Sequence, residues 1–270
     1  MTLVIIGPVT QDLVVIGGKS TYKVGGATYF QSFVFEKFYN DYLAIVNCCD
    51  ESIADEFPSR DKVKVILKDD THFFINSYPN EDNKDYRDQL SNFVQIPILK
   101  NDLEEILPEN IDGFVINPLN RYDFPTETMD YLKSFNVPIF ISVQGFLRIP
   151  DVEVNGNYTI KLDTFDNLTN VLEGVSSIFL DEYEASIIGM DFDVDELVIT
   201  DGSNGSRIIS DNYETKINAF ACDNIADATG CGDTYMAAYI SRRINGYSIK
   251  HSGEFASKIA SEKLTKFGHY

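Results

Sequence analysis

The chain has 270 residues, and its 42 acidic side chains outnumber the 22 basic ones, giving a formal net charge of −20. Proteins that track nucleic acid or an anionic membrane surface need clustered Lys and Arg, so this balance argues against both partners. The composition, 44% apolar and 24% charged, excludes the disordered and fibrous classes. No apolar run reaches the roughly 18–20 residues of a membrane span, and residues 1–8 predict a strand rather than a signal peptide.

The four cysteines predict a reduced, cytoplasmic protein without structural zinc. Cys48 and Cys49 are adjacent, which suits no disulfide framework, and the chain has no Cys-x-x-Cys spacing. Cys222 and Cys231 lie far away in the sequence.

Short apolar runs alternate with helical patterns along most of the chain. The runs are rich in Val, Ile and Phe and lack in/out alternation, which is typical of parallel strands covered on both faces. This order predicts right-handed crossovers and a doubly wound, mainly parallel α/β sheet. The expected strands are Leu3–Ile6, Tyr42–Val46, Phe114–Ile116, Ile139–Val143, Ile178–Leu180 and Leu197–Ile199. The expected helices are Ala27–Tyr39, Thr126–Phe135, Glu182–Ile188, Thr234–Ile244 and Glu254–Lys266.

Two segments do not follow this strand–helix alternation, and they predict a small antiparallel β flap. The first has turn residues Gly17-Gly18 between two strand-like runs, which indicates a hairpin. The second ends in a polar, turn-prone stretch that does not suit a buried sheet. The strand-like segments are Leu13–Ile16, Tyr22–Val24, Val63–Leu67 and His72–Asn76. We therefore expect one domain over residues 1–270, with a β lid formed from about residues 11–25 and 63–93.

The sharpest motif is Asp227-Ala228-Thr229-Gly230-Cys231-Gly232-Asp233, which runs directly into a helical pattern. A Gly-x-Gly at a loop-to-helix junction lets the backbone approach a ligand, and the first N–H groups of the helix form an anion site. Asp233, in the first turn, could accept a proton from a hydroxyl aimed at a bound phosphate. A glycine-rich turn with a capping Asp explains the same local pattern.

This segment resembles the C-terminal signature of the ribokinase-like (PfkB) family of carbohydrate kinases. The resemblance implies a ribokinase-like fold, with Asp233 as the catalytic base and with Asp227 and Thr229 at the nucleotide. The backbone N–H groups that it implies for the anion hole are those of Gly230, Cys231 and Gly232. Ala228 and Cys231 depart from the usual residues, but neither change removes the base or the backbone amides.

Asp12 and the Gly25-Gly26 pair are similar to the substrate end of this family. There an Asp binds sugar hydroxyls, and a di-glycine acts as hinge and contact. Asn76, on an expected lid strand, is placed at the substrate with them. Phe30 stands where the family often has Asn, which argues against a plain ribose-type contact. A surface Asp and a strand-to-helix turn explain Asp12 and the glycines equally.

Asp181-Glu182-Tyr183-Glu184 resembles the Asn-x-x-Glu element of the family, with Asp in place of Asn. The resemblance implies that Glu184, with Asp181, acts on Mg²⁺ through water. Carboxylates at the carboxyl end of a parallel strand suit this role, because Mg²⁺ keeps several waters and takes one or two carboxylates plus phosphate oxygens. A capping box explains the same two residues, and the two interpretations are compatible.

Two further segments resemble parts of the nucleotide and substrate sites. Thr200-Asp201-Gly202-Ser203-Asn204-Gly205 matches the Thr-x-Gly-x-x-Gly turn that lines the nucleotide, and it also predicts a hairpin turn. The residues implied at ATP are Thr200, Gly202 and Gly205. The stretch from Ser142 to Arg148 resembles a segment of sugar-acid and polyol kinases. Arg148 could reach a phosphate as a charge-assisted fork, or it could be exposed.

Together the motifs imply an ATP-dependent kinase that phosphorylates a hydroxyl of a small sugar, sugar acid or polyol such as inositol. Mg²⁺ is expected with ATP, and a monovalent cation such as K⁺ is compatible with the family. A nucleoside kinase and a non-catalytic sugar-binding relative are the alternatives. A dinucleotide-binding oxidoreductase is excluded, since no Gly-x-Gly-x-x-Gly follows the first strand. Relatives commonly pair through their lid strands, so we expect a homodimer formed by the β lid.

Overall fold

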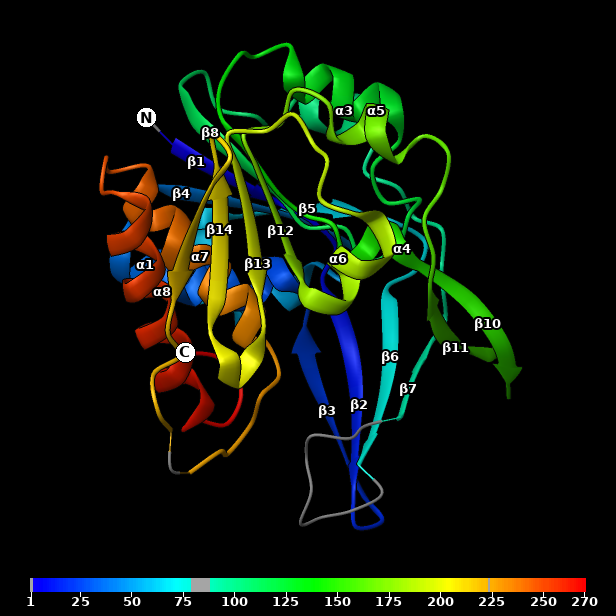
Figure 1. Ribbon diagram of the computed structural model, residues 1–270. Coiled ribbons are helices and arrows are strands. Elements are labelled where there is room, and N and C mark those ends of the chain that lie inside the picture. Colours follow the sequence, from blue (N-terminus) through cyan, green and yellow to red (C-terminus); the bar gives the residue numbers. More distant parts are fainter. Residues whose placement is uncertain (1, 79–87, 223) are drawn as a thin grey trace.

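The computed structural model describes residues 2–78, 88–222 and 224–270 (Figure 1). Within them, a nine-stranded sheet forms the body of the protein. Its strands are β1 (Thr2–Ile6), β4 (Tyr42–Cys48), β5 (Val63–Leu67), β8 (Ile111–Ile116), β9 (Ile139–Ser142), β12 (Ser177–Asp181), β13 (Glu196–Thr200), β14 (Ser206–Ser210) and β15 (Tyr213–Ile217). They lie in the order β15-β14-β13-β12-β9-β8-β1-β4-β5. All neighbouring pairs are parallel except β13–β14 and β14–β15.

Helices cover both faces of this sheet, as the apolar runs predicted. One face carries α1 (Ala27–Phe38), α7 (Cys231–Arg243) and α8 (Ile249–Leu264). The other carries α2 (Lys100–Glu104), α3 (Thr126–Lys133), α4 (Gln144–Leu147), α5 (Leu168–Leu172) and α6 (Glu182–Ile188). Short 3₁₀ helices lie at Glu51–Glu56, Arg60–Lys62 and Gly202–Asn204.

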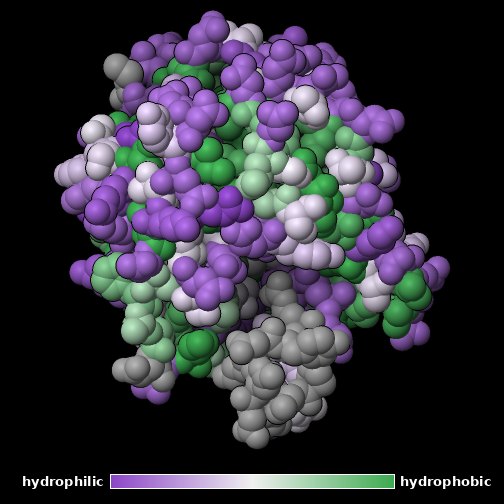
Figure 2. Space-filling view, in the orientation of Figure 1, coloured by the Kyte–Doolittle hydropathy of each residue, from purple (hydrophilic) through white to green (hydrophobic). Residues whose placement is uncertain are grey.

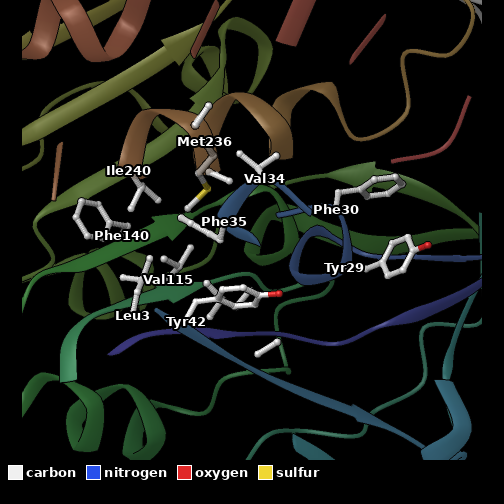
Figure 3. Packing of buried hydrophobic residues seen from close by; sticks show 14 of the residues in the cluster. Leu3, Tyr29, Phe30, Val34, Phe35, Tyr42, Val115, Phe140, Met236 and Ile240 are labelled. Carbon is white, nitrogen blue, oxygen red and sulfur yellow. The ribbon is translucent and has the colours of Figure 1, made fainter. Parts of the chain in front are cut away.

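Two hydrophobic cores result, because successive strand residues point to opposite faces. Leu3 belongs to the core under α1 and α7, whereas the next residue, Val4, belongs to the core on the other face. Figure 3 shows Phe35 of α1 and Met236 of α7 beside the sheet residues of the first core. Both faces of the central strands are thus buried, and ligands can reach the sheet only at its edges.

A six-stranded sheet extends from this body, below it in Figure 1. Its strands are β2 (Thr10–Ile16), β3 (Lys19–Gly25), β6 (His72–Tyr78), β7 (Asp88–Ser91), β10 (Arg148–Val154) and β11 (Asn157–Leu162). They lie in the order β10-β11-β7-β6-β2-β3, and all pairs are antiparallel except β2–β6. We call this sheet the lid. The fold is thus the expected mainly parallel α/β sheet with a separate, largely antiparallel one.

The structure corrects the expected composition of the lid. Val63–Leu67 is an edge strand of the large sheet, hydrogen-bonded in parallel to β4, so the expectation that it joins the lid is wrong. The lid instead gains β10 and β11, which the sequence analysis did not anticipate. Residues 79–87 of the expected lid lie outside the described residues.

On the face shown in Figure 2, hydrophilic side chains are spread over the body, with hydrophobic side chains exposed between them. In the described part of the chain, no helix combines the length and the apolar character needed to cross a bilayer.

Candidate active site

A cavity of about 880 Å³ lies where the lid meets the carboxyl edge of the large sheet. One wall consists of lid strands β2, β3 and β6, and the opposite wall of residues 226–233 at the start of α7. Many predicted site residues line it: Asp12, Gly26, Asn76, Arg148, Asp227, Thr229, Gly230, Cys231, Gly232 and Asp233. Gly25, Asp181, Glu184, Thr200, Gly202 and Gly205 are not among the lining residues.

The glycine-rich loop forms the N-terminus of α7. Gly230 caps the helix in a left-handed conformation with φ 76°, and its carbonyl accepts the Thr234 N–H at 2.8 Å. Cys231 also lines the cavity, but its N–H already donates to the Ala228 carbonyl at 3.2 Å. Within the described residues, the N–H groups of Gly230 and Gly232 have no hydrogen-bond partner. These two N–H groups, beside the positive end of the helix dipole, form a candidate anion site.

Phe30 explains why residue 230 is glycine. A Cβ added at Gly230 would lie 2.6 Å from the Phe30 ring, so the loop rests directly on this buried aromatic side chain. A Cβ added at Gly232 would meet no atom within 4 Å. Phe30, which replaces the Asn that the family often has, therefore packs directly against the glycine-rich loop.

Asp227 holds this loop in place. Its carboxylate accepts the N–H groups of Thr229 at 2.9 Å and Gly268 at 3.1 Å, and its own N–H donates to the Leu264 carbonyl. Burial alone would raise the pKa of Asp227, but these hydrogen bonds outweigh it and hold the pKa below its usual range. An ionised Asp227 thus ties the loop to residues that follow α8.

Asp233 lies three residues into α7 and lines the cavity. Its carboxylate therefore stands in the same first turn as the anion site, at the distance of one helical turn or less. Cys231, two residues earlier, turns its thiol toward the Ala260 carbonyl of α8, and burial raises the pKa of that thiol to about 11. The Cys231 thiol therefore stays protonated at neutral pH, and Asp233 is the carboxylate of this turn that lines the cavity.

The lid supplies the opposite polar groups. Asp12 on β2 and Asn76 on β6 point to the cavity because both occupy the same face of the paired strands. The Gln89 amide of β7 donates to Asn76 Oδ1 at 2.8 Å and fixes its orientation. Gly25 is needed beside Asp12, because an added Cβ would lie 2.6 Å from an Asp12 carboxylate oxygen. Gly25 is thus a spacing residue, whereas Gly26 itself faces the cavity.

Arg148 is buried, so the alternative that its side chain is simply exposed to solvent is wrong. It begins β10, its guanidinium donates to Gln144 Oε1 at 2.8 Å, and its charge lies 5.4 Å from the centre of the Phe74 ring on β6. Arg148 lines the cavity, and its charge also acts on the Glu184 carboxylate. The chain therefore places a fixed cation between the body and the lid.

Asp181 and Glu184 form the predicted capping box at the start of α6. Glu184 N–H donates to Asp181 Oδ1 at 2.7 Å, and Asp181 N–H donates to Glu184 Oε2 at 2.9 Å. Burial, with a smaller contribution from the Asp181 charge, raises the pKa of Glu184 to about 7. The described residues contain no cluster of three or more His, Cys, Asp or Glu side chains fit for a metal. Two carboxylates suit an Mg²⁺ that keeps its waters and phosphate ligands, not a closed protein site.

The Thr200–Gly205 turn joins β13 to β14, as predicted, and lies outside the lined cavity. Thr200 is nevertheless adjacent to Asp181, because β12 and β13 are parallel and in register there. The Ser206 hydroxyl is 2.7 Å from the Tyr235 hydroxyl, which joins this turn to α7. The structure therefore connects the end of this turn to α7 through Ser206, without placing Thr200, Gly202 or Gly205 in the cavity.

Sequence reasoning missed three groups of the site. Lys263 donates to the Asp227 carbonyl, and Phe267 and Gly268 line the cavity. Gln89 lines it from β7. Only Gln89 could have been found from the sequence, as a polar residue in the expected lid. The other residues reach the site because the chain reverses direction after α8, and no local sequence pattern specifies that reversal.

Comparisons with known proteins agree with this geometry. Residues 166–270 match the model of the pfkB family carbohydrate kinases. A nucleoside kinase of Methanocaldococcus jannaschii is 27% identical over 156 residues, which are 48% of this chain and 52% of that protein. A ribokinase of Bacillus subtilis is 28% identical over 180 residues, which are 62% of this chain and 53% of that protein. The aligned parts span about half the length of both relatives.

A solved structure matches nearly the whole chain. It is a pyrophosphate-dependent kinase in the ribokinase family, complexed with a pyrophosphate analog and myo-inositol. The TM-score is 0.80 at 21% identity, over 99% of this chain and 96% of the other. At this identity the match shows the ribokinase fold. The match of residues 166–270 to the pfkB family model agrees with the resemblance of the C-terminal motifs to this family.

Glu184→Gln is expected to stabilise the metal-free protein while lowering its activity. The neutral amide still accepts the Asp181 N–H but removes a buried charge, whose cost is reflected in the raised pKa of Glu184. Thermal unfolding without metal should therefore occur at a higher temperature than in the wild type. Turnover should require more Mg²⁺, with exposed Glu254→Gln on α8 as the control. An unchanged magnesium titration would remove Glu184 from the metal site.

Proposed function

We propose that this protein is an ATP-dependent kinase that transfers a phosphoryl group to a hydroxyl of a small sugar or polyol. The observation that carries the proposal is the meeting of Asp233, two ligand-facing N–H groups and the lid residue Asp12 around one cavity. An anion site and a carboxylate base in one helical turn suit attack by a hydroxyl on a terminal phosphate.

In the proposed reaction the substrate hydroxyl loses its proton to the Asp233 carboxylate as its oxygen bonds to the γ-phosphorus. The bond from that phosphorus to the bridging oxygen breaks, and ADP leaves. The N–H groups of Gly230 and Gly232 hold the equatorial oxygens, and Arg148 adds a charge-assisted contact. Glu184 and Asp181 would hold Mg²⁺ through water, and the bound ion would supply positive charge to the triphosphate. The lid strands exclude water, which would otherwise compete as the acceptor.

The polar character of the lid wall favours a polyhydroxylated acceptor. Asp12, Asn76 and Gln89 all line the cavity, and the last two are hydrogen-bonded to each other through their amides. Carboxylate and amide side chains can form hydrogen bonds with several hydroxyl groups of one substrate. The structurally similar kinase that binds myo-inositol supports this class. A nucleoside is the second candidate, because Phe74 and Tyr78 also line the cavity and offer rings on which a base could stack.

A donor-by-acceptor matrix tests the proposal. Purified protein is incubated with ATP or pyrophosphate and Mg²⁺, and with inositols, pentoses, hexoses, sugar acids or nucleosides, and products are resolved by mass spectrometry. We expect transfer from ATP to a sugar or polyol and none in the Asp233→Asn protein. If phosphoryl transfer occurs from pyrophosphate and not from ATP, pyrophosphate is the donor and the ATP assignment is wrong. If only nucleosides are phosphorylated, the sugar or polyol assignment is wrong. No transfer in any combination, with bound ligands seen by thermal shift, would favour a non-catalytic binding protein.

We also propose that two copies pair through the outer face of the lid. The register of β2, β6 and β7 places five partly buried apolar residues on one face, opposite to Asp12 and Asn76. They are Leu13, Val15, Phe73, Ile75 and Leu90. A contiguous apolar face of this kind typically marks an interaction surface. A second copy is the occupant that the lid fits, because a sheet face is self-complementary about a two-fold axis.

Ile75→Lys is expected to convert the dimer to a monomer, because it places a charge at the centre of the apolar lid face. Analytical ultracentrifugation should show a two-chain species for the wild type and a single chain for the variant. Tyr213→Lys, at an exposed position on the edge strand β15, is the control and should remain dimeric. A wild type that sediments as one 30.5 kDa chain at all concentrations would contradict the pairing.

A further inference from the structure

Lys263 is a lysine with no solvent exposure, on the last turn of α8. Lysine is almost never fully buried unless it is paired, because removing its charge from water is costly. Yet no carboxylate oxygen of the described residues lies within 4.0 Å of its ammonium group to form a salt bridge. Its hydrogen bond goes instead to a neutral acceptor, the backbone carbonyl of Asp227, at 2.8 Å. The charge of Lys263 is one of the causes that lower the pKa of the Asp227 carboxyl, although the two groups form no salt bridge. The chain therefore keeps a buried positive charge beside the first residue of the glycine-rich loop.

The position of this charge connects it to the anion loop. Lys263 is not among the residues that line the cavity, so it lies behind the loop whose front faces the ligand. The adjacent Leu264 carbonyl accepts the N–H groups of Ala226 and Asp227. The end of α8 thus contacts the first residues of the loop through two groups. The Leu264 carbonyl accepts hydrogen bonds from them, and the Lys263 ammonium donates one.

The remaining polar atoms of the loop's first residue are already used. Both carboxylate oxygens of Asp227 accept backbone N–H groups, from Thr229 and Gly268. Within the described residues, the Asp227 carbonyl would lose its partner if the lysine were removed, and the loop would lose a positive charge. In a site of low polarity such a charge attracts a phosphate strongly, because few solvent dipoles screen it.

We propose that Lys263 is a positioning residue of the phosphoryl site. Its ammonium group holds residues 227–232 in their anion-binding form and supplies a fixed positive charge behind them. Because the chain provides this charge itself, turnover does not need the K⁺ that the family resemblance allowed. The proposal rests on the proposed kinase function, but its effect on anion binding is measurable without turnover.

Three variants test the proposal. Lys263→Met keeps the length of the side chain without its charge, and Lys263→Ala leaves a space that ethylammonium can enter. Lys258→Met, at an exposed lysine on the same helix, is the matched control. Each protein is assayed for kcat and KM in the presence and absence of ethylammonium. Inorganic phosphate is titrated separately, with thermal unfolding as the readout of anion binding.

We expect Lys263→Met to lower kcat at least about tenfold, short of the ~10²–10³ lost with a direct oxyanion donor. The acceptor KM should stay within about twofold, because the lysine does not touch the acceptor. Stabilisation by phosphate should be lost. Ethylammonium should restore turnover to Lys263→Ala but not to Lys263→Met, whose side chain fills the space. A merely structural lysine would not give this difference.

The opposite results are equally clear. Turnover and phosphate stabilisation of Lys263→Met that match those of Lys258→Met would overturn the proposal. So would ethylammonium that restores the melting temperature of Lys263→Ala without its turnover. If both variants fail to fold, wild-type turnover in K⁺, Na⁺ or tetramethylammonium buffer decides: equal rates support the internal cation, and a strict K⁺ requirement refutes it. A wild type without kinase activity would refute the proposed function, while the phosphate titration still tests Lys263.

Discussion

Asp233→Asn should leave the fold intact and reduce phosphoryl transfer by about 10²–10⁴-fold, the usual contribution of a general base. Asparagine has nearly the same shape and can stay in the first turn of α7, but it cannot take a proton from the attacking hydroxyl. The loss should appear in kcat, because the acceptor still binds to the lid residues Asp12 and Asn76. Steady-state kinetics with the acceptor found in the donor-by-acceptor matrix measure it.

Glu254→Gln provides the control for Asp233→Asn. Glu254 is an exposed residue of α8 that does not line the cavity, so its neutralisation should alter kcat by no more than about twofold. Thermal unfolding should show only a small loss for Asp233→Asn, about 0.3–1 kcal/mol from the weaker interaction with the helix dipole. Wild-type turnover by folded Asp233→Asn would remove this residue from the chemistry.

Gly230→Ala should produce the largest loss of stability among substitutions in the site. A non-glycine residue in the left-handed conformation costs about 1–2 kcal/mol, and residue 230 has φ 76°. The added Cβ would also lie 2.6 Å from the Phe30 ring, and such overpacking costs about 1–3 kcal/mol. Chemical denaturation should therefore show a clear fall in the free energy of unfolding, with loss of turnover as the loop shifts.

Two variants separate the causes of the Gly230→Ala effect. Gly232→Ala has open space around its Cβ, so its free energy of unfolding should stay near the wild-type value. Phe30→Leu combined with Gly230→Ala should relieve the overlap but keep the backbone cost, so the effect of Gly230→Ala should shrink in this background. If Gly230→Ala is as stable as Gly232→Ala, the loop does not rest on Phe30.

Much of the α/β body could be predicted because its signals are local. The buried runs of β1, β4, β8, β9, β12 and β13 need both faces covered, which only a parallel sheet between helices provides. The start of α7 was placed at Thr234, three residues late, because Gly230 and Gly232 disguise the first turn. The Val63–Leu67 strand was assigned to the wrong sheet, since an edge strand carries the same pattern in either sheet.

Some residues of the candidate site could likewise be predicted from local motifs, whereas others could not. Asp233, Gly230 and Asp12 carry their signals in short motifs, so a sequence is enough to propose them. Lys263 has no such signal, because its role depends on the chain reversal after α8 that brings it to the Asp227 carbonyl. The engaged Cys231 N–H likewise follows from the turn geometry of residues 228–231.

By itself, the sequence determined the layered α/β body, the glycine-led helix and the residue types of an anion site, because periodicity and backbone freedom act over a few residues. Only the tertiary structure decided which strands form the lid, which N–H groups of the glycine-rich loop have partners among the described residues and which group the buried Lys263 contacts. Those features depend on contacts between segments far apart in the chain, and pairing and burial at such distances are set by the whole packed molecule.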